Sequence, residues 1–301
     1  MRIGFTLPQA GPPAHQVREA ARYAREAEAL GADSLWAYDR LLAPVNPTIG
    51  YFGGDTFPPE FRATLDPFAL LAVAATATVR VKLGTNVLNA PWYPPAMLAR
   101  SLTTIDQLSG GRLIPGFGTG WSPEEFQAAG IPMNERGARL DECLDALEAL
   151  WTTNPAEYHG RHWHVPATHA DIKPAQHPRP PIYLAGFVPA AMRRVALRAD
   201  GWLPIVVPGA TDIDFVSTIA TPMAHIRELA EQAGRDPGQL GMILKVYPTA
   251  TASIRDIADA IVEAGDKAGV DHAFVDPMYL AKSIDHALEI MSGVLELARA
   301  C

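Results

Sequence analysis

The sequence predicts a (β/α)8 TIM barrel, an α/β fold in which eight parallel strands alternate with helices. Eight short apolar runs recur along the 301 residues, and helix-like segments separate them, an alternation that is typical of a parallel sheet. The length also fits, since a barrel of this kind needs about 250 residues. The first run is not followed by Gly-x-Gly-x-x-Gly, which argues against a doubly wound dinucleotide-binding sheet. We therefore expect a single barrel domain over residues 1–301.

The expected strands are short, apolar and bounded by turn-forming residues. Their carboxyl ends should gather at one mouth of the barrel, where ligands bind. In chain order they are Arg2–Leu7, Ser34–Tyr38, Val81–Leu88, Leu113–Phe117, Pro181–Ala185, Trp202–Val207, Met242–Tyr247 and His272–Val275.

The expected helices repeat apolar or small residues at helical spacing. The segment Ala14–Leu30 alternates such residues with charged ones, and Gly31 follows it as a C-cap. The other expected helices are Pro94–Leu108, Glu135–Trp151, Pro189–Arg198, Asp212–Ala233, Ile254–Ala268 and Ala281–Ala300.

Two stretches break this alternation and are expected to be insertions. Residues 41–63 are rich in Pro, Gly and aromatic side chains and follow the second strand, so we expect a lid or substrate wall at the mouth. Residues 154–180 contain five histidines. On a strand His162 and His164 would share one face, but the third ligand of a zinc site is missing and the stretch also fits a hairpin with a glycine turn. No metal site is predicted.

Composition narrows the class of protein. The chain is 48% hydrophobic, carries a net charge of −8 and has no basic run, which argues against a nucleic-acid partner. No apolar run reaches the roughly 18 residues that span a bilayer, and the N-terminus lacks the features of a signal peptide. The two cysteines, Cys143 and Cys301, favour a reducing compartment. We expect a cytoplasmic protein that acts on a small molecule.

The carboxyl ends of two expected strands are rich in small and polar residues. Asn86 and Asn89 lie at the end of the third strand, and Gly118, Thr119 and Gly120 lie at the end of the fourth. Because glycine has no Cβ, the backbone there can approach a flat ligand closely. These residues predict a binding surface at the mouth.

Other candidate residues stand at further strand ends. Asp39 and Arg40 close the second strand, where a carboxylate orients a ring or handles a proton; an ordinary salt bridge is the alternative. Ala185-Gly186-Phe187 precedes a helix that begins at Pro189, a pattern typical of phosphate binding by backbone N–H groups, and the loop at Val207 is a second candidate for that role.

Three blocks of the chain resemble the bacterial luciferase-like superfamily of flavin and deazaflavin proteins, and the likeness extends over nearly the whole chain. The branch to which the chain is most similar is that of the coenzyme F420-dependent oxidoreductases. The blocks are LGTNVLNAPWYPPAMLARSLTTIDQLSGGRL (83–113), PGFGTGWSPEEFQAAGIPMNERGARLDECLDALEALW (115–151) and PPIYLAGFVPAAMRRVALRADGWLP (180–204).

The resemblance implies a deazaflavin ring at the barrel mouth, with its phosphate tail toward the late strands. It implies a non-prolyl cis peptide in the third strand, between Asn86 and Val87, and an acidic residue, Asp39, that holds the ring. The implied cofactor-binding residues are Asp39, Thr85, Asn86, Val87, Gly118, Thr119, Gly120, Ala185, Gly186, Phe187 and Val207.

The chain departs from the family pattern at two positions. Many F420-dependent members carry His directly after the aspartate, where this chain has Arg40. Arginine is a poor base, with a pKa above about 12, so we expect it to bind an anionic substrate or the phosphate or ring oxygens of the deazaflavin. Trp121 stands where the sugar-phosphate dehydrogenases of the superfamily carry Glu, which argues against a sugar-phosphate substrate. Trp36, Trp92 and Trp121 are expected to line a hydrophobic substrate pocket, in which the last two either stack on a ring or cap the barrel.

We therefore expect an F420-dependent oxidoreductase that transfers a hydride between the deazaflavin and a small, hydrophobic organic substrate, with Asp39 and Arg40 as catalytic residues. Two alternatives stay open. One is an FMN-dependent monooxygenase that uses O2 and reduced flavin from a partner reductase. The other is a barrel that binds a flavin or deazaflavin without turnover. The resemblance also implies a homodimer that forms through early barrel helices.

Overall fold

A computed structural model describes residues 1–210 and 212–300. Its parallel strands are short, and several of the expected strands consist of two segments. In chain order the parallel strands are β1 (Arg2–Thr6), β2 (Ser34–Ala37), β3 (Lys82–Thr85), β4 (Leu88–Asn89), β5 (Leu113–Ile114), β6 (Gly116–Gly118), β9 (Tyr183–Leu184), β10 (Gly201–Trp202), β11 (Ile205–Val206), β12 (Gly241–Met242), β13 (Leu244–Val246) and β14 (His272–Val275).

The strand pairings form a closed circuit through all eight expected strand positions. β1 pairs with β14 and with β2, and β2 continues through β3 to β5. β4 pairs with β6, which continues through β9 and β10 to β12. β11 pairs with β13, and β13 returns to β14. All these pairs are parallel, so the expected barrel is confirmed.

The divided strands have local causes. Pro115 separates β5 from β6, and Pro204 lies between β10 and β11. Proline has no N–H to give to the ladder, so pairing stops there and resumes on the next segment. Between β3 and β4 the peptide bond joining Asn86 to Val87 is cis, as the family resemblance implies.

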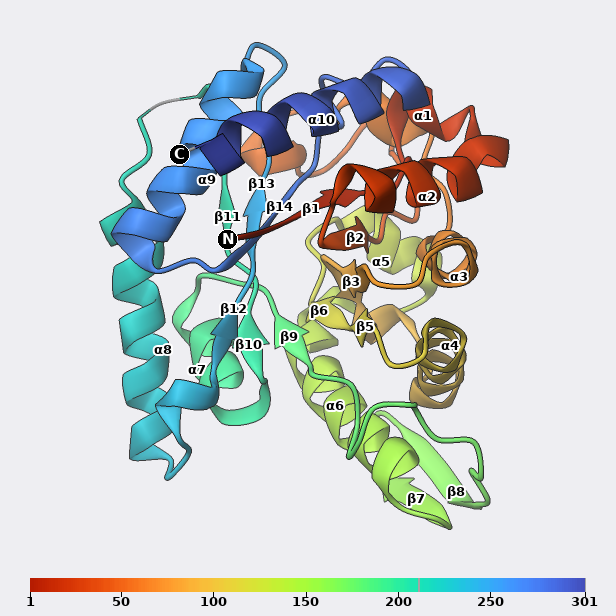
Figure 1. The fold of residues 1–301 in the computed structure, drawn as a ribbon. Coiled ribbons are helices and arrows are strands. Elements are labelled where there is room, and N and C mark those ends of the chain that lie inside the picture. Colours follow the sequence, from red (N-terminus) through yellow and green to blue (C-terminus); the bar gives the residue numbers. More distant parts are fainter. Residues whose placement is uncertain (211, 301) are drawn as a thin grey trace.

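Helices surround the strands, with α2, α3 and α4 along one side and α10 beside α2 (Figure 1). Short 3-10 turns join several of them. The helices are α1 (Gly11–Ala14), α2 (Ala20–Leu30), α3 (Pro67–Ala77), α4 (Pro95–Ser109), α5 (Pro123–Ala129), α6 (Arg136–Thr152), α7 (Pro189–Arg198), α8 (Thr221–Gln232), α9 (Ile254–Ala268) and α10 (Ile284–Ala300).

The helices differ from the sequence prediction in three places. The expected helix Ala14–Leu30 is divided into α1, a 3-10 turn and α2, although Gly31 does cap it in the left-handed region. The expected helix from Asp212 begins only with a π-helical turn at Val216, and α8 follows. The sequence pattern does not predict α3 or α5: α3 reads PFALLAVAATA and has no polar face to show a helical period, and α5 has only seven residues.

The interior of the barrel is a small apolar layer that includes Trp36. Its indole ring stacks on Phe274, with ring centroids 4.4 Å apart, and Nε1 donates a hydrogen bond to Ser34 Oγ. Gly84 lies against the face of this ring, where a Cβ would collide with it. Trp36 is fully buried, so the expectation that it lines the substrate pocket is wrong. The layer consists of Trp36, Ile114, Leu203, Ile243 and Phe274.

The histidine-rich insertion forms the antiparallel hairpin of β7 (Ala156–His159) and β8 (His164–Thr168), which projects beside the end of α6 (Figure 1). His162 lies in the turn, not on a strand, so it does not share a strand face with His164. Instead, Nδ1 of His159 lies 3.0 Å from Nδ1 of His164. Within the described ranges, no group of three or more His, Cys, Asp or Glu side chains is arranged to hold a metal ion.

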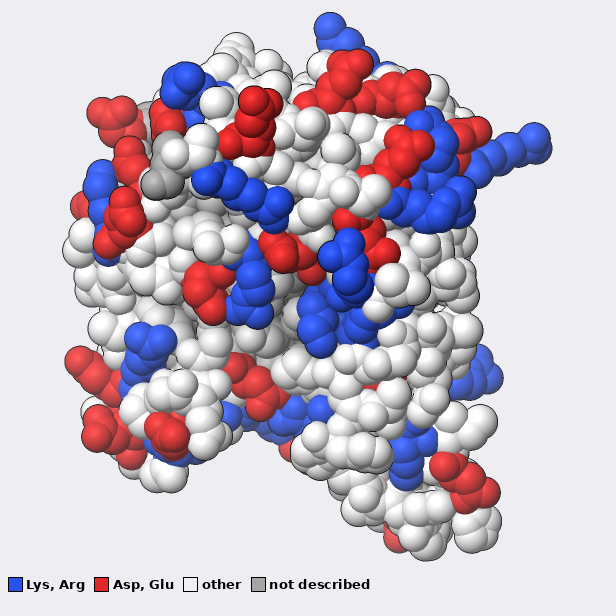
Figure 2. Space-filling model, viewed as in Figure 1, with Lys and Arg blue, Asp and Glu red and all other residues white. Residues whose placement is uncertain are grey.

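Charged side chains of both signs are interspersed over the face of the molecule in Figure 2. This arrangement agrees with the absence of a basic run in the sequence. None of the helices in residues 1–210 and 212–300 combines the length and the apolar character that crossing a bilayer requires.

Candidate active site

A cleft of about 520 Å³ opens at the carboxyl ends of the barrel strands. Most of the residues singled out in the sequence lie around it, together with several that were not. Its lining residues are Tyr38, Asp39, Arg40, Ile49, Gly50, Tyr51, Phe52, Gly53, Phe61, Asn86, Val87, Asn89, Gly118, Thr119, Gly120, Trp121, Ala185, Gly186, Phe187, Leu203, Ile205, Lys245, Tyr247 and Asp276.

Asp39 is held firmly at one wall of this cleft. Its Oδ1 accepts a hydrogen bond from the Tyr93 hydroxyl at 2.7 Å, and its Oδ2 accepts one from the Asn89 backbone N–H at 2.8 Å. Burial raises the pKa of the Asp39 carboxyl to about 7, against the opposing effect of these two hydrogen bonds. The group therefore changes charge near neutral pH, as a proton-handling residue or a ring-orienting residue would.

Arg40 is fixed by an internal partner. Its Nη1 lies 2.8 Å from Glu125 Oε2, and both side chains are buried. The guanidinium also lies over the rings of Phe61 and Trp121, with its central carbon 4.8 and 4.9 Å from the ring centroids. Because its charge is already paired, Arg40 is poorly placed to bind an anionic substrate, contrary to what the sequence suggests. Its Nε is buried and has no hydrogen-bond partner among the described residues.

Glu125 also ties down the start of the loop that covers the cleft. Its Oε1 accepts hydrogen bonds from the backbone N–H groups of Leu41 and Leu42, at 2.7 and 3.3 Å. Burial raises the pKa of Glu125, and the nearby Arg40 charge opposes this shift. The insertion at residues 41–63 thus begins from a buried anchor.

The rest of this loop adds aromatic side chains to the cleft wall. Tyr51 packs against Phe61 and Trp121, with ring centroids 5.0 and 5.7 Å apart, and against Tyr247 at 6.2 Å. Phe52, which has a positive φ of 51°, lines the cleft and is 66% exposed. The expectation that residues 41–63 form a wall or lid fits this position.

The cleft also has a floor of nearly bare backbone. A Cβ on Gly118 would come within 2.6 Å of a Val87 methyl group, so only glycine fits there without displacement. Gly120 and Gly186 have positive φ values of 73° and 130°. Nδ2 of Asn86 is buried and lacks a hydrogen-bond partner within the described ranges. A flat ligand with carbonyl oxygens would fit against such a floor and would satisfy that donor.

Sequence reasoning missed an ion pair at the base of the cleft. Lys245 on β13 lies 2.7 Å from Asp276 Oδ2, directly after β14, and Asp276 Oδ1 accepts a hydrogen bond from the Thr6 hydroxyl. Lys245 is 7% exposed and Asp276 2%. A lysine inside the apolar run MILKVY was the signal that could have revealed it, since buried lysines are rare.

Three other candidates lie away from the cleft. Thr85 is fully buried and exchanges hydrogen bonds with the backbone of Gly116. Val207 lines neither this cleft nor the second cavity described below. Trp92 packs on Phe126, with ring centroids 5.9 Å apart, and is not among the residues that line the cleft, whereas Trp121 is. A role of Trp92 in a substrate pocket stays a prediction.

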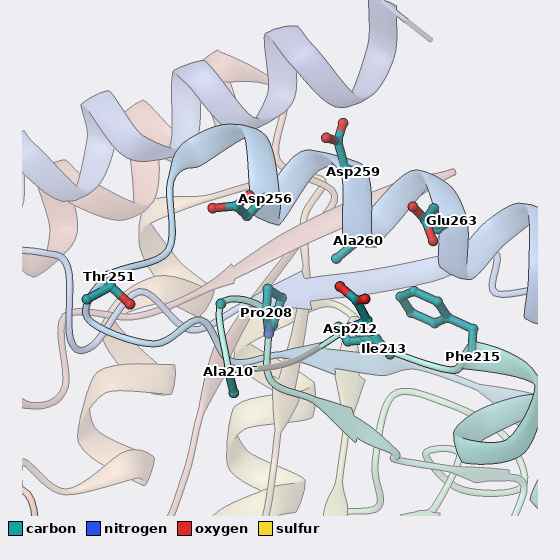
Figure 3. Close-up of a pocket in the computed structure, with 11 residues that line it drawn as sticks. Pro208, Ala210, Asp212, Ile213, Phe215, Thr251, Asp256, Asp259, Ala260 and Glu263 are labelled. Atoms are coloured by element: carbon teal, nitrogen blue, oxygen red, sulfur yellow. The ribbon is translucent and has the colours of Figure 1, made fainter.

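A second cavity, of about 510 Å³, lies between the loop after β11 and α9. Figure 3 shows Asp256, Asp259 and Glu263 on α9, with Asp212 on the opposite loop. Asp256 already serves in the capping box of α9, and Glu263 pairs with Lys267. This cavity shares no lining residue with the cleft, and its acidic side chains would repel a phosphate.

Comparisons with known proteins agree with this geometry. A family model described as luciferase-like monooxygenase matches residues 1–289. An uncharacterized protein of Mycobacterium tuberculosis is 32% identical over 215 residues, which are 70% of this chain and 71% of that protein. The phthiodiolone/phenolphthiodiolone dimycocerosates ketoreductase of Mycobacterium bovis is 32% identical over 218 residues, which are 70% of this chain and 55% of the ketoreductase.

Two solved structures share the fold over the full length. Monooxygenase RslO1 from Streptomyces bottropensis superposes with a TM-score of 0.77 at 22% identity, covering 100% of this chain and 99% of that chain. An F420-dependent secondary alcohol dehydrogenase, solved with an F420-acetone adduct, superposes with a TM-score of 0.75 at 16% identity, covering 99% of each chain. At such identities these likenesses show the fold alone. From the match over residues 1–289, the chain belongs to the luciferase-like monooxygenase family.

Proposed function

We propose that this protein is an F420-dependent oxidoreductase that acts on a small, largely apolar organic substrate. The observation that carries the proposal is the cleft itself, which is lined by a glycine-rich floor, by an Asn86 amide donor without a partner among the described residues, and by an aromatic wall. A relative at 32% identity is a ketoreductase, and one of the structures with this fold is an F420-dependent alcohol dehydrogenase. Both likenesses support reduction or oxidation by hydride transfer.

The residues present fit a deazaflavin ring. The backbone of Gly118–Gly120 and Val87 would lie against the ring face, and Asn86 Nδ2 would donate to a ring carbonyl. Ala185, Gly186 and Phe187 line the cleft just before α7, and the amino end of this helix would meet the phosphate tail. The bound cofactor would supply the hydride chemistry.

Asp39 and Arg40 have different tasks in this proposal. Asp39, with a pKa of about 7 and with a hydrogen bond accepted by each of its two oxygens, orients the ring edge and holds a proton close to the cleft. Arg40 is a positioning residue, because its charge is paired with that of Glu125 and its guanidinium lies over the ring of Trp121. The aromatic loop excludes water from the reacting atoms.

An FMN-dependent monooxygenase is the second candidate. The family model is named for that activity, and a monooxygenase shares the fold. This reading would require reduced flavin from a partner reductase. A barrel that binds its cofactor without turnover is the third reading, and the position of Arg40 after Asp39, where many F420-dependent members have His, is what motivates it. A homodimer and a cytoplasmic location remain predictions from the sequence.

Titration of the purified protein with oxidised F420 and, separately, with FMN tests the proposal, with cofactor fluorescence as the signal. We expect micromolar or tighter binding of F420 and much weaker binding of FMN. Tight FMN binding with no binding of F420 would overturn the proposal in favour of the monooxygenase.

A matched pair of glycine variants tests whether the floor of the cleft is the binding surface. In Gly118→Ala the added methyl group would collide with Val87, so we expect cofactor affinity to fall at least about tenfold. In Gly137→Ala, on α6, the nearest atom to the new Cβ lies 3.5 Å away, and affinity should not change. Equal affinity in both variants would place the cofactor elsewhere.

A further inference from the structure

We propose that Lys245, held in place by Asp276, binds the oxygen atom of a neutral carbonyl or hydroxyl substrate at the base of the cleft. This inference rests on the proposed function and adds the substrate class to it. Neither residue lies in the regions of the chain that suggested a cofactor. Lys245 is on β13 and Asp276 directly follows β14, two neighbouring strands late in the chain, and both residues line the cleft.

The alternation of side chains along β13 points Lys245 toward the barrel interior. Leu244 and Val246 pack into the main core between the strands and the helices, so the residue between them faces the opposite way. Asp276 stands two residues beyond Phe274, which belongs to the interior apolar layer. The pair therefore lies at the inner end of the cleft, next to that layer.

Fold stability does not account for a buried ion pair in this place. Taking two charges out of water costs several kcal/mol per ion. Replacing such a pair by apolar residues of similar size often leaves the stability of the fold unchanged or raises it. The neighbouring interior layer combines apolar side chains with the buried polar residues Ser34 and His272, and burial lowers the pKa of His272 to about 4, so this layer is filled without a charged side chain at neutral pH. A buried lysine that lines a cleft is thus better explained by a ligand.

The surroundings of Lys245 leave it able to donate. Its Nζ lies over the rings of Tyr247 and Tyr38, 4.5 and 5.1 Å from the centroids, and Asp276 is its one ionic partner among the described residues. An ammonium group has three N–H donors. The two rings would hold the apolar part of a small substrate while a remaining N–H of Nζ donates to its oxygen.

The charge balance of the cleft favours a neutral substrate. Four charged side chains line it: Arg40 is paired with Glu125, Lys245 is paired with Asp276, and Asp39 has no cationic partner in residues 1–210 and 212–300. An anionic substrate would find no unpaired cation there and would lie near a carboxylate. A neutral molecule with one oxygen needs no unpaired cation and is not repelled by the carboxylate.

The test uses two probes that differ only in the oxygen, acetophenone and α-methylstyrene, in which a CH2 group replaces the carbonyl oxygen. Dissociation constants are measured by calorimetry on the protein loaded with the cofactor that it binds. The variants are Lys245→Met, Lys245→Arg and the double variant Lys245→Met/Asp276→Asn, which leaves no lone buried charge. Lys267→Met on α9 is the control, because Lys267 is an exposed lysine that pairs with Glu263, and neither residue lines the cleft.

We expect the wild-type protein and Lys267→Met to bind acetophenone about tenfold or more tightly than α-methylstyrene, the range of a hydrogen bond from a charged donor. Lys245→Met and the double variant should bind both probes about equally, and Lys245→Arg should keep part of the preference. Cofactor affinity should stay within about threefold of wild type in all of them, because the lysine serves the substrate.

Three results would overturn the inference. One is an unchanged preference in folded Lys245→Met and in the double variant. Another is a loss of cofactor affinity in place of probe affinity. The third is failure of the wild-type protein to bind either probe. If the protein binds neither F420 nor FMN, the proposed function fails, and the same probe pair measured on the cofactor-free protein still decides the role of Lys245.

Discussion

The Tyr93 hydroxyl donates a hydrogen bond to Asp39 Oδ1 at 2.7 Å, which joins the end of the second strand to the segment after the third. With the N–H of Asn89 on the other oxygen, both carboxylate oxygens have a donor. These two bonds favour the charged carboxylate, whereas burial favours the neutral acid, and the balance leaves the pKa at about 7.

Removing the Tyr93 hydroxyl should move this balance. In Tyr93→Phe one bond to the charged carboxylate is lost, so the pKa of Asp39 should rise above 7. The pH midpoint for cofactor binding should then shift to higher pH by about half a unit to one unit. Cofactor titrations from about pH 5 to about pH 9 measure this shift. A midpoint that stays in place would show that another group sets the pH dependence.

Asp39 should also give stability a specific pH dependence. Its pKa in the folded protein, about 7, is higher than the 3.8 of the free side chain. The folded state therefore holds the proton more tightly, and this contribution is complete below pH 3.8 and is lost as the pH rises through 7. It amounts to a loss on the order of 4 kcal/mol over that window.

The comparison of wild type with Asp39→Asn isolates this contribution. The free energy of unfolding, obtained from urea denaturation at several pH values, should fall less steeply in the variant between pH 4 and pH 7, a window of roughly three units. Parallel curves for the two proteins would contradict a raised pKa for Asp39. Asp266→Asn, at an exposed position on α9, is the matched control and should follow wild type.

The Arg40–Glu125 pair should stabilise the fold and hold the aromatic loop, residues 41–63, in place. Glu125→Ala leaves a buried guanidinium without its partner and frees two backbone N–H groups, so we expect a loss of about 3–5 kcal/mol in the free energy of unfolding. Residues 41–63 should also become more sensitive to limited proteolysis. Glu148→Ala, which breaks the more exposed pair with Arg179, should cost less than about 1 kcal/mol. Equal losses in the two variants would contradict the anchoring role.

Trp121 and Trp92 should separate substrate binding from packing. Trp121 lines the cleft and stacks with Phe57 at 5.1 Å, so Trp121→Ala should raise KM for an aromatic substrate about tenfold or more. Trp92→Ala should lower stability through its lost packing on Phe126 while KM changes little. Steady-state kinetics with thermal unfolding of both variants distinguish the two roles, and a larger KM effect in Trp92→Ala would contradict them.

The barrel was predictable because its signal is local. Each expected strand is an apolar run with a turn-forming residue after it, and the parallel order follows from the helices between the runs. The place of Gly118 and Gly120 at the mouth could also be predicted, since they follow the fourth expected strand. The cis peptide at Asn86–Val87 came from the family resemblance and not from local pattern.

The errors concern contacts between distant parts of the chain. Nothing near Arg40 in the sequence reveals Glu125, which lies 85 positions later and neutralises it. Trp36 was assigned to the mouth although it stands on the inward face of a strand, below the end of β2 and against Gly84. Lys245 and Asp276 meet only because the barrel closes and brings the seventh and eighth strands together.

Anaerobic reaction of the protein with reduced F420 and a panel of neutral aryl and alkyl ketones addresses the proposed chemistry itself. Recovery of the absorbance of the oxidised deazaflavin reports the reaction, and the alcohol formed is quantified. We expect absorbance to recover without oxygen, with one alcohol formed per cofactor oxidised, for at least one ketone, and not in Gly118→Ala. No recovery with any ketone, together with substrate oxidation that needs reduced FMN and O2, would contradict the hydride-transfer function.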